Sequence, residues 1–283
     1  KKITKAMELI ASSRIVKAQQ RLDASMPYLT QLVDAVSAAA SHASDVSKHP
    51  LTAKADKQER AAVLIITADR GLAGAYSTNS IKEGEALTQN LNDKGMTVLP
   101  FVVGRKGVSY YRFRGREMGG EYTGFTDQPS YADAKRIGGD LLAAFYGDEN
   151  QEGGVDEIHV VYTHFINMGT QETRVRRILP LEVVDEVIEP NESGMPFPLY
   201  EFEPSSEGVL DALLPRYIEQ MVYLSLLTSA ASEHAARRRA MKSATDNAEE
   251  LIRSLTRQAN QARQAEITQE ISEIVGGADA LSA

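Results

Sequence analysis

The sequence contains no cysteine and no tryptophan, and it has no long apolar run. Without cysteine, neither disulfide bonds nor thiolate metal sites can form. No apolar run approaches the ~18 residues that a membrane span needs, and nothing resembles a signal peptide. We therefore expect any membrane association to come through a partner. Lys1 already falls within a helical pattern, so we expect a short N-terminal piece to precede it.

Proline and glycine are also scarce in the C-terminal part of the chain. Between residues 207 and 275 only Gly208 and Pro215 interrupt a helical pattern, and both fall in its first turns. A helix of ~69 residues would be a rod about 100 Å long. A compact body of this chain length has a radius of gyration near ~19 Å. The sequence therefore predicts that most of this helix projects beyond the body.

The N-terminal 48 residues show a helical period as well. Leu22, Leu29 and Val36 repeat every seven residues, with Met26, Val33 and Ala40 four residues after each. Pro27 interrupts this pattern by removing one backbone hydrogen bond. The pattern indicates either a single helix kinked at Pro27 or two helices, with Ser25 capping the second.

The C-terminal segment carries a matching apolar stripe over a longer distance. It begins with large residues such as Leu214 and Leu224, continues mostly with alanine and ends with Ile267, Ile271 and Ile274. Ala248 and Leu255 belong to the same stripe. A lone projecting helix would leave this stripe in water, so we expect the N-terminal helix to cover it as an antiparallel partner.

Strand and helix patterns alternate between residues 58 and 200. The runs "RAAVLIITA", "MTVLPFVV" and "VDEIHVVYTHF" predict buried strands, and "ETRVRRILPLEV" predicts an edge strand. Helical patterns cover 75–91, 105–113 and 131–146. The predicted fold class is α/β: a long antiparallel coiled coil of the N- and C-terminal helices plus a Rossmann-like α/β domain with a largely parallel sheet. The expected domains are 1–57 and 206–283 for the shaft and 58–205 for the α/β domain.

The net charge of −8 is distributed unevenly. Residues 1–21 carry six basic residues against one acid, and residues 237–263 carry seven against three. Arg14, Lys17 and Arg21 share one helical face. This face could bind RNA or an acidic protein, or it could simply be solvated. No aromatic residue is interleaved with these charges, which favours an acidic protein over nucleic acid.

No motif indicates catalysis or a cofactor. The stretch "IITADRGLAGAYS" has a strand, a glycine loop and a helix, as phosphate-binding loops do, but it matches neither common phosphate motif. A tight turn is the favoured interpretation. The acidic residues of "GDENQEGG", 147–154, lack the spacing of a calcium loop, and the histidines form no metal-ligand set. We expect a protein that is not an enzyme by itself.

Three stretches of the sequence resemble one known family. "KKITKAMELIASSRIVKAQ", "ITADRGLAGAYSTN" and "ATDNAEELI" with "ARQAEITQEISEIVGGADA" are similar to the gamma subunit of F-type ATP synthases. The stretches occur in the family's order at both ends and in the middle of the chain. The resemblance therefore covers nearly the whole chain.

This resemblance implies a rotor shaft and a set of partners. The shaft would turn inside a ring of three alpha and three beta subunits, with its foot on the c-subunit ring beside the epsilon subunit. It would couple proton flow to ATP synthesis and hydrolysis, regulate both, and bind neither cofactor, metal nor nucleic acid. It would be a peripheral protein on the cytoplasmic side of the bacterial cell membrane and touch the membrane only through the c ring.

The resemblance also assigns roles to individual residues. Near the start of the chain, the stretch that faces a lever loop of beta would be represented by Met7, Glu8, Arg14 and Lys17. The part gripped by the catch loops of beta would include Arg263, Gln264, Thr268, Gln269 and Glu270. The tip that turns in an apolar sleeve would include Ile271, Ile274 and Val275. The c-ring contact would involve Phe202 and Glu203. The chain departs from the family in a longer acidic loop at 147–154 and in the hydrophilic Glu201.

Overall fold

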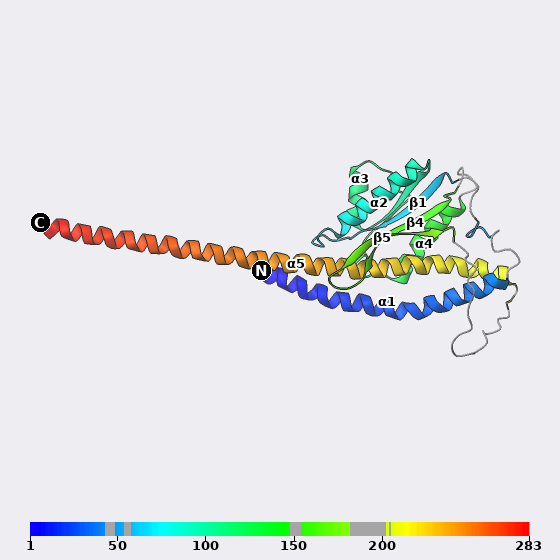
Figure 1. Cartoon of the computed structure of the whole chain (residues 1–283), viewed down its shortest axis with the longest axis horizontal. Helices are drawn as coiled ribbons and strands as arrows, with labels where there is room; N and C mark the ends of the chain where they lie inside the picture. The colour runs from blue at the N-terminus through cyan, green and yellow to red at the C-terminus, as the bar shows by residue number, and fades with distance from the viewer. Residues whose placement is uncertain (43–48, 54–57, 148–153, 182–201, 204, 283) are drawn as a thin grey trace.

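Two long helices from the ends of the chain lie side by side and carry an α/β body on one flank (Figure 1). The computed structural model describes residues 1–42, 49–53, 58–147, 154–181, 202–203 and 205–282, with side chains up to residue 274 in the last range. The acidic stretch 148–153 and Glu201 lie outside the described residues. The predicted fold class is confirmed.

The body is built on a five-stranded sheet in the order β3-β2-β1-β4-β5. Its strands are β1 (Arg60–Ile66), β2 (Thr97–Val103), β3 (Gly120–Tyr122), β4 (Glu157–Phe165) and β5 (Gln171–Leu179). All neighbouring strands are parallel except β4 and β5. The four predicted strands are confirmed. The short strand β3 was not predicted, because its three residues are too few to show an alternating pattern.

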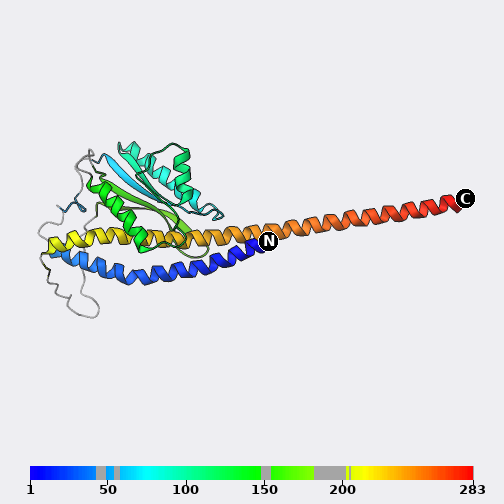
Figure 2. The same ribbon diagram turned by 180° about the vertical axis from the view of Figure 1, so that it is seen from behind.

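Helices cover both faces of the sheet. The helices of the body are α2 (Tyr76–Asp93), α3 (Arg105–Phe113) and α4 (Tyr131–Tyr146). On one face, Val63 and Val161 pack in a cluster with Val108 of α3 and Leu91 of α2. The other face is covered by α4 and by the C-terminal helix α5 (Ser206–Ser282). The sheet thus holds α5 firmly along one side, as the two opposite views show (Figures 1 and 2).

The N-terminal helix α1 (Lys2–His42) is a single helix that runs through Pro27. The alternative of two helices is therefore wrong. Figure 1 shows α1 bowed along its length. Pro27 is exposed, so the carbonyl that loses its partner there faces water.

Helices α1 and α5 are antiparallel and pack through small residues. Ile15 and Ala18 of α1 form a buried cluster with Ala231 and Ala235 of α5 and with Phe165. Alanine lets the helix backbones approach closely. Polar contacts fix the register at each end: the hydroxyl oxygens of Thr4 and Thr245 are 2.7 Å apart, and the Ser206 hydroxyl donates to the His42 carbonyl over 3.2 Å.

Within the given chain, the pairing of α1 with α5 extends from Ser206 to Glu249. Lys1 forms an ion pair with Glu249 over 2.9 Å, and beyond this point α5 continues alone to Ser282 (Figure 1). Ala248 is half-buried at the end of the pair, whereas Leu255 is 53% exposed. Leu255 lies beyond the part of α5 that Lys1 reaches, so its cover by the N-terminal helix stays a prediction. Helix α5 also continues past its predicted end at residue 275 and includes Gly276 and Gly277.

We expect Ala231→Asp to destabilise the isolated chain by several kcal/mol, because it buries a carboxylate between α1, α5 and Phe165. Leu255→Asp should change the free energy of unfolding by less than about 0.5 kcal/mol, because that side chain is exposed. Urea unfolding followed by circular dichroism measures both. Equal destabilisation by the two substitutions would contradict this description of the helix pair.

Candidate functional surfaces of the helix pair

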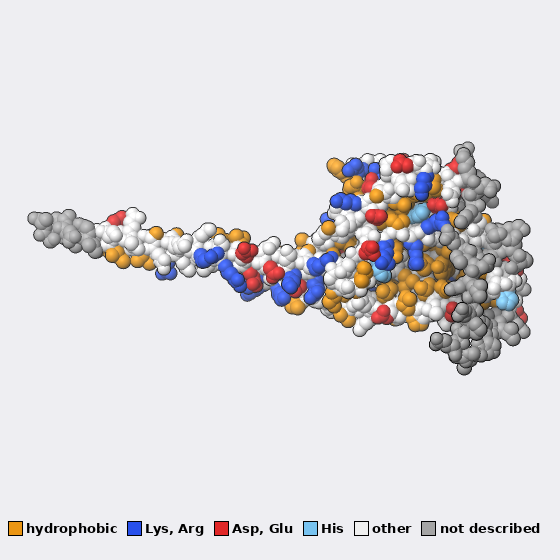
Figure 3. Space-filling model, viewed as in Figure 1, with side chains coloured by type: hydrophobic (Ala, Val, Ile, Leu, Met, Phe, Trp, Pro, Cys, Tyr) orange, Lys and Arg blue, Asp and Glu red, His pale blue; other side chains and the backbone are white. Residues whose placement is uncertain are grey.

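The protruding part of α5 presents an unusual number of bare apolar side chains. The exposed fractions are 60% for Leu251, 52% for Ile252, 56% for Ile271 and 71% for Ile274. They follow helical spacing, and a lone helix with such a stripe normally meets a partner. Within the described part of the chain no other element covers them (Figure 3).

The residues assigned to the beta catch loops lie on this same bare segment. Arg263, Gln264, Thr268, Gln269 and Glu270 are all exposed. Thr268 donates its hydroxyl to the Gln264 carbonyl, and Gln269 donates to the Glu273 carboxylate over 3.0 Å. These contacts stay within the helix, so the outer surfaces of the five side chains are available to other proteins. Val275 is helical, and its side chain is outside the described residues.

The predicted N-terminal contact residues are partly used inside the chain. Met7 is half-buried, and Glu8 is buried and pairs with Lys5 over 3.1 Å. Arg14 pairs with Asp127 over 2.5 Å. Lys17 and Arg21 are exposed on the same side of α1, beside a cavity of about 120 Å³ between α1, α5 and residues 127–129. The predicted basic face therefore exists, but its first member is already neutralised.

Asp127 connects the body to both long helices. Its carboxylate accepts from Arg14 of α1, and its backbone carbonyl accepts from Nε2 of His234 of α5 over 3.0 Å. The pKa of His234 is lowered to about 4, mainly by burial and also by Arg237 and Arg14, while the hydrogen bond to the Asp127 carbonyl opposes this shift. His234 is therefore neutral at pH 7, with its proton on Nε2.

Next to His234, α5 carries a buried ion pair. Arg237 Nη2 lies 2.6 Å from Glu233 Oε1 and 3.5 Å from the Gly71 carbonyl, at the end of the sheet. Burial raises the pKa of Glu233, whereas Arg237 and Thr126 act against this rise. We call Arg14, Asp127, Glu233, His234 and Arg237 the junction cluster. Only Arg14 was singled out from the sequence: Glu233 and Arg237 are an i, i+4 pair on one helix, but their neighbours Asp127 and Arg14 lie far from them along the chain.

Asp69 explains the glycine-containing stretch after β1. Its carboxylate accepts from the backbone N–H groups of Arg105, Gly124 and Thr126 over 2.7–3.1 Å. Burial raises the pKa of Asp69, but these N–H groups and the Arg105 side chain outweigh burial and lower it overall. Asp69 thus ties three loops together at the carboxyl edge of the sheet. The turn interpretation agrees with Gly74 and Leu72, whose φ angles are +55° and +64°.

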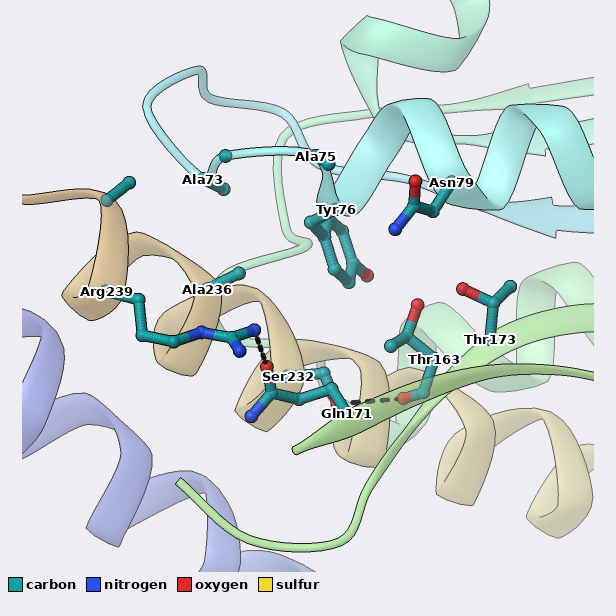
Figure 4. A pocket seen from close by; sticks show the side chains of 12 residues that line it. Ala73, Ala75, Tyr76, Asn79, Thr163, Gln171, Thr173, Ser232, Ala236 and Arg239 are labelled. Atoms are coloured by element: carbon teal, nitrogen blue, oxygen red, sulfur yellow. Dashed lines mark hydrogen bonds between the residues drawn. The ribbon is translucent and has the colours of Figure 1, made fainter. Parts of the chain in front are cut away.

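A cavity of about 330 Å³ lies beside this loop, between the start of α2, the ends of β4 and β5, and α5 (Figure 4). Hydroxyl and amide groups line it, including those of Tyr76, Asn79 and Ser232. Its one charged lining residue, Arg239, donates to Gln171 and to the Gly169 carbonyl. These bonds engage the arginine and fasten the β4–β5 hairpin to α5.

At the opposite end of the helix pair lie the residues assigned to the c ring. Phe202 is half-buried next to the start of α5. The centre of its ring lies 5.4 Å from the centre of the His42 ring. Glu203 is exposed. Among the described residues, no three acidic or histidine side chains are grouped as a metal would require. The described helices include none that is long and apolar enough to cross a membrane.

Comparison with known proteins supports one family over the whole chain. A family model described as ATP synthase matches residues 1–281. ATP synthase gamma chains of Kineococcus radiotolerans and Acidothermus cellulolyticus are 60% and 61% identical over 282 residues, which is all of this chain and 92% of each relative. The gamma chain of Streptomyces coelicolor is 58% identical over 285 residues and is also covered to 92%.

Solved structures with low sequence identity share the fold. A chain from the central stalk and c-ring structure of Tetrahymena thermophila mitochondrial ATP synthase has a TM-score of 0.61 at 22% identity, covering 86% of this chain and 99% of that one. A chain of the Euglena gracilis mitochondrial enzyme has a TM-score of 0.56 at 17% identity, covering 95% of each. From the curated relatives and the family model, the chain belongs to the ATP synthase gamma-chain family, the non-catalytic subunit that forms the central-stalk rotor of F-type ATP synthases.

Proposed function

We propose that the chain transmits torque between a ring of c subunits and three beta subunits, so that proton flow drives ATP synthesis and ATP hydrolysis drives the reverse rotation. Helix α5 carries this proposal. Its first half is buried against the sheet and α1, and its last part carries a stripe of exposed apolar side chains. A rod held at one end and enclosed by partners at the other can transmit rotation. Because rotation reaches the beta subunits only through this chain, it also regulates ATPase activity and proton flow.

Coupling requires that the rotor contact the beta subunits unequally. A ligand or partner shifts a conformational equilibrium only by its differential affinity for the two states. A single helix has different side chains at each angle around its axis, so each beta subunit would meet a different surface at a given moment. The reciprocal effect, by which nucleotide binding turns the rotor, follows from linkage.

We assign the beta contacts to two segments. Arg263, Gln264, Thr268, Gln269 and Glu270 would meet the catch loops, and Ile271, Ile274 and Val275 would turn in the apolar sleeve. On α1, Met7, Glu8, Arg14 and Lys17 would form the surface toward the lever loop. Since Glu8 and Arg14 pair within the chain, Lys17 and the neighbouring Arg21 would carry most of the free charge there.

The other end of the rotor would rest on the c ring. Phe202 and Glu203 lie beside the last turn of α1 and the first turn of α5, where both helices are paired. In this arrangement 1–57 and 206–283 act as the shaft and 58–205 acts as the foot, with epsilon beside it. The chain would then be a peripheral protein on the cytoplasmic face of the membrane that touches the bilayer only through the c ring.

The apolar tip gives the most direct test. We expect Ile271→Asp with Ile274→Asp to leave the stability of the isolated chain unchanged, since both side chains are exposed. In the assembled enzyme the same pair should weaken the tip contact, because burying each isoleucine is worth about 1.5–3 kcal/mol. Inverted vesicles should therefore pump fewer protons per ATP hydrolysed.

Asn260→Asp with Ser272→Asp is the matched control, because it adds two carboxylates to polar, exposed positions of the same helix. Alpha and beta subunits that co-purify with each variant are quantified alongside pumping and hydrolysis. Full pumping and full recovery of alpha and beta by the isoleucine variant would sink the proposal that the tip turns inside a sleeve.

The basic face of α1 makes a second prediction. We expect Lys17→Glu with Arg21→Glu to lower ATP hydrolysis of the assembled enzyme about two- to tenfold at low salt, since exposed ion pairs contribute ~0–1 kcal/mol each. The difference should shrink at high salt because of screening. Lys82→Glu with Lys94→Glu, on the outside of the body, is the control. Salt-independent loss, or equal loss in the control, would argue against an acidic partner.

The junction cluster should make the isolated chain sensitive to acid. His234 binds its proton near pH 4 in the folded chain and near pH 6.5 when unfolded, so its contribution to stability is present above pH 6.5 and lost on going down to pH 4. The loss is up to about 3 kcal/mol, at roughly 1.4 kcal/mol per pKa unit. Glu233 contributes with the opposite sign, since its pKa is raised.

The comparison that isolates His234 is with His234→Gln, which retains a donor for the Asp127 carbonyl. Urea unfolding between pH 7 and pH 4 should show a shallower loss of stability for the variant than for the parent chain. His159, whose pKa burial also lowers, contributes equally to both. Identical pH profiles for the two chains would mean that His234 is not held neutral at the junction.

A further inference from the structure

Helix α3 and the turn after it form the most basic short segment of the body. Residues 105–117 contain five basic residues and one acid, in a chain whose net charge is −8. Three of these arginines have acidic partners in the body: Arg105 pairs with Asp69, Arg112 with Glu121 and Arg116 with Glu85. Among the described residues, Lys106 and Arg114 have no carboxylate within ion-pair distance. The segment therefore keeps free positive charge.

An aromatic side chain stands out from the middle of this charge. Phe113, the last residue of α3, is 91% exposed, the largest exposed fraction among the large apolar side chains of the described structure. Beside it, the Arg114 guanidinium lies 5.2 Å from the centre of the Tyr110 ring. Isolated apolar side chains are common on protein surfaces. An aromatic ring flanked by arginines, however, is the composition that protein interfaces favour at their centres.

Helix α3 lies at the end of the body from which the protruding part of α5 emerges (Figures 1 and 2). Gly104, with a φ of +91°, turns the chain from β2 into α3, and a Cβ there would lie 2.4 Å from the Thr67 carbonyl oxygen. This turn fixes α3 at the carboxyl edge of the parallel strands. In both views α3 occupies the side of the body from which α5 emerges, with the sheet and α2 between them (Figures 1 and 2).

From these observations we infer that Phe113, Lys106 and Arg114 form a docking surface for an acidic protein segment with an apolar recess, on the subunits that surround the protruding part of α5. Because the patch lies away from the axis of α5, it meets those subunits one at a time as the rotor turns. In a ring of three pairs it would pass equivalent positions three times per turn and favour three angular positions. This identification of the partner rests on the proposed function; the surface itself does not.

The absence of cysteine allows a direct test. A Phe113→Cys chain is labelled with a photoreactive maleimide, assembled with alpha and beta subunits and irradiated, and the linked peptides are identified by mass spectrometry. Phe113 is so exposed that its replacement leaves the core untouched. Ala132→Cys, exposed on α4 on the opposite face of the sheet, is the control.

We expect the label at position 113 to link to peptides of alpha or beta rich in Asp and Glu, in clear excess over the label at 132. Adding Lys106→Glu and Arg114→Glu should reduce this yield about two- to tenfold at low salt, as two exposed charge pairs would. Equal yields at 113 and 132, or a yield that the reversals leave unchanged, would overturn the inference. So would linkage mainly to lipid, nucleic acid or a second copy of the chain.

The same experiment separates this inference from the proposed function. If the labelled chain fails to co-purify with alpha and beta, the proposed function is wrong. If the complex assembles and hydrolyses ATP but position 113 does not link, only the docking surface is wrong.

Discussion

Burial of the first half of α5 is the interaction on which the rest of the structure depends. Leu210, Leu214, Ile218 and Val222 lie almost fully inside the core that α5 shares with the sheet and α4. Further along, Ala231 and Ala235 meet α1. Burying apolar surface stabilises a fold by about 25 cal/mol per Å². The buried side chains therefore hold one long helix against two different neighbours, the body and α1. The remaining length of α5 can then be bare, because the body already determines where it points.

Polar groups at the junction make this attachment specific. A buried ion pair such as Glu233 with Arg237 adds little net stability, since desolvation offsets much of the attraction. Its geometry, however, is restrictive. Arg237 also donates to the Gly71 carbonyl, and His234 donates to the Asp127 carbonyl. Any other orientation of α5 would break these buried hydrogen bonds. The helix pair thus meets the body in one rotational setting. In a rotor, this fixed orientation makes the end of α5 turn together with the α/β body.

Much of the fold could be predicted from periodicity, and the limits of that prediction have physical causes. The runs that became β1, β2 and β4 are apolar enough to be recognised locally, and 105–113 and 131–146 match α3 and α4. The stripe of α5 was also recognised, and its predicted antiparallel partner, α1, is confirmed for the residues of α5 up to Glu249. Ile252 and Leu255 repeat with the same spacing as Leu224, although the former are exposed and the latter packs on the core. Periodicity therefore predicts that a face is covered, but it does not say which element or partner covers it.

The candidate site shows the same division. Exposed residues such as Gln264 and Gln269 could be assigned through resemblance, because the motif around them is continuous in sequence. Asp127 and His234 could not, since their contact joins positions far apart in the chain. Arg14 belongs to both groups: its helical face was predicted, yet its partner within the chain was not. Charges counted along a sequence therefore overestimate the charge offered to a partner, and on α1 this leaves Lys17 and Arg21 as the residues through which an acidic neighbour would be sensed.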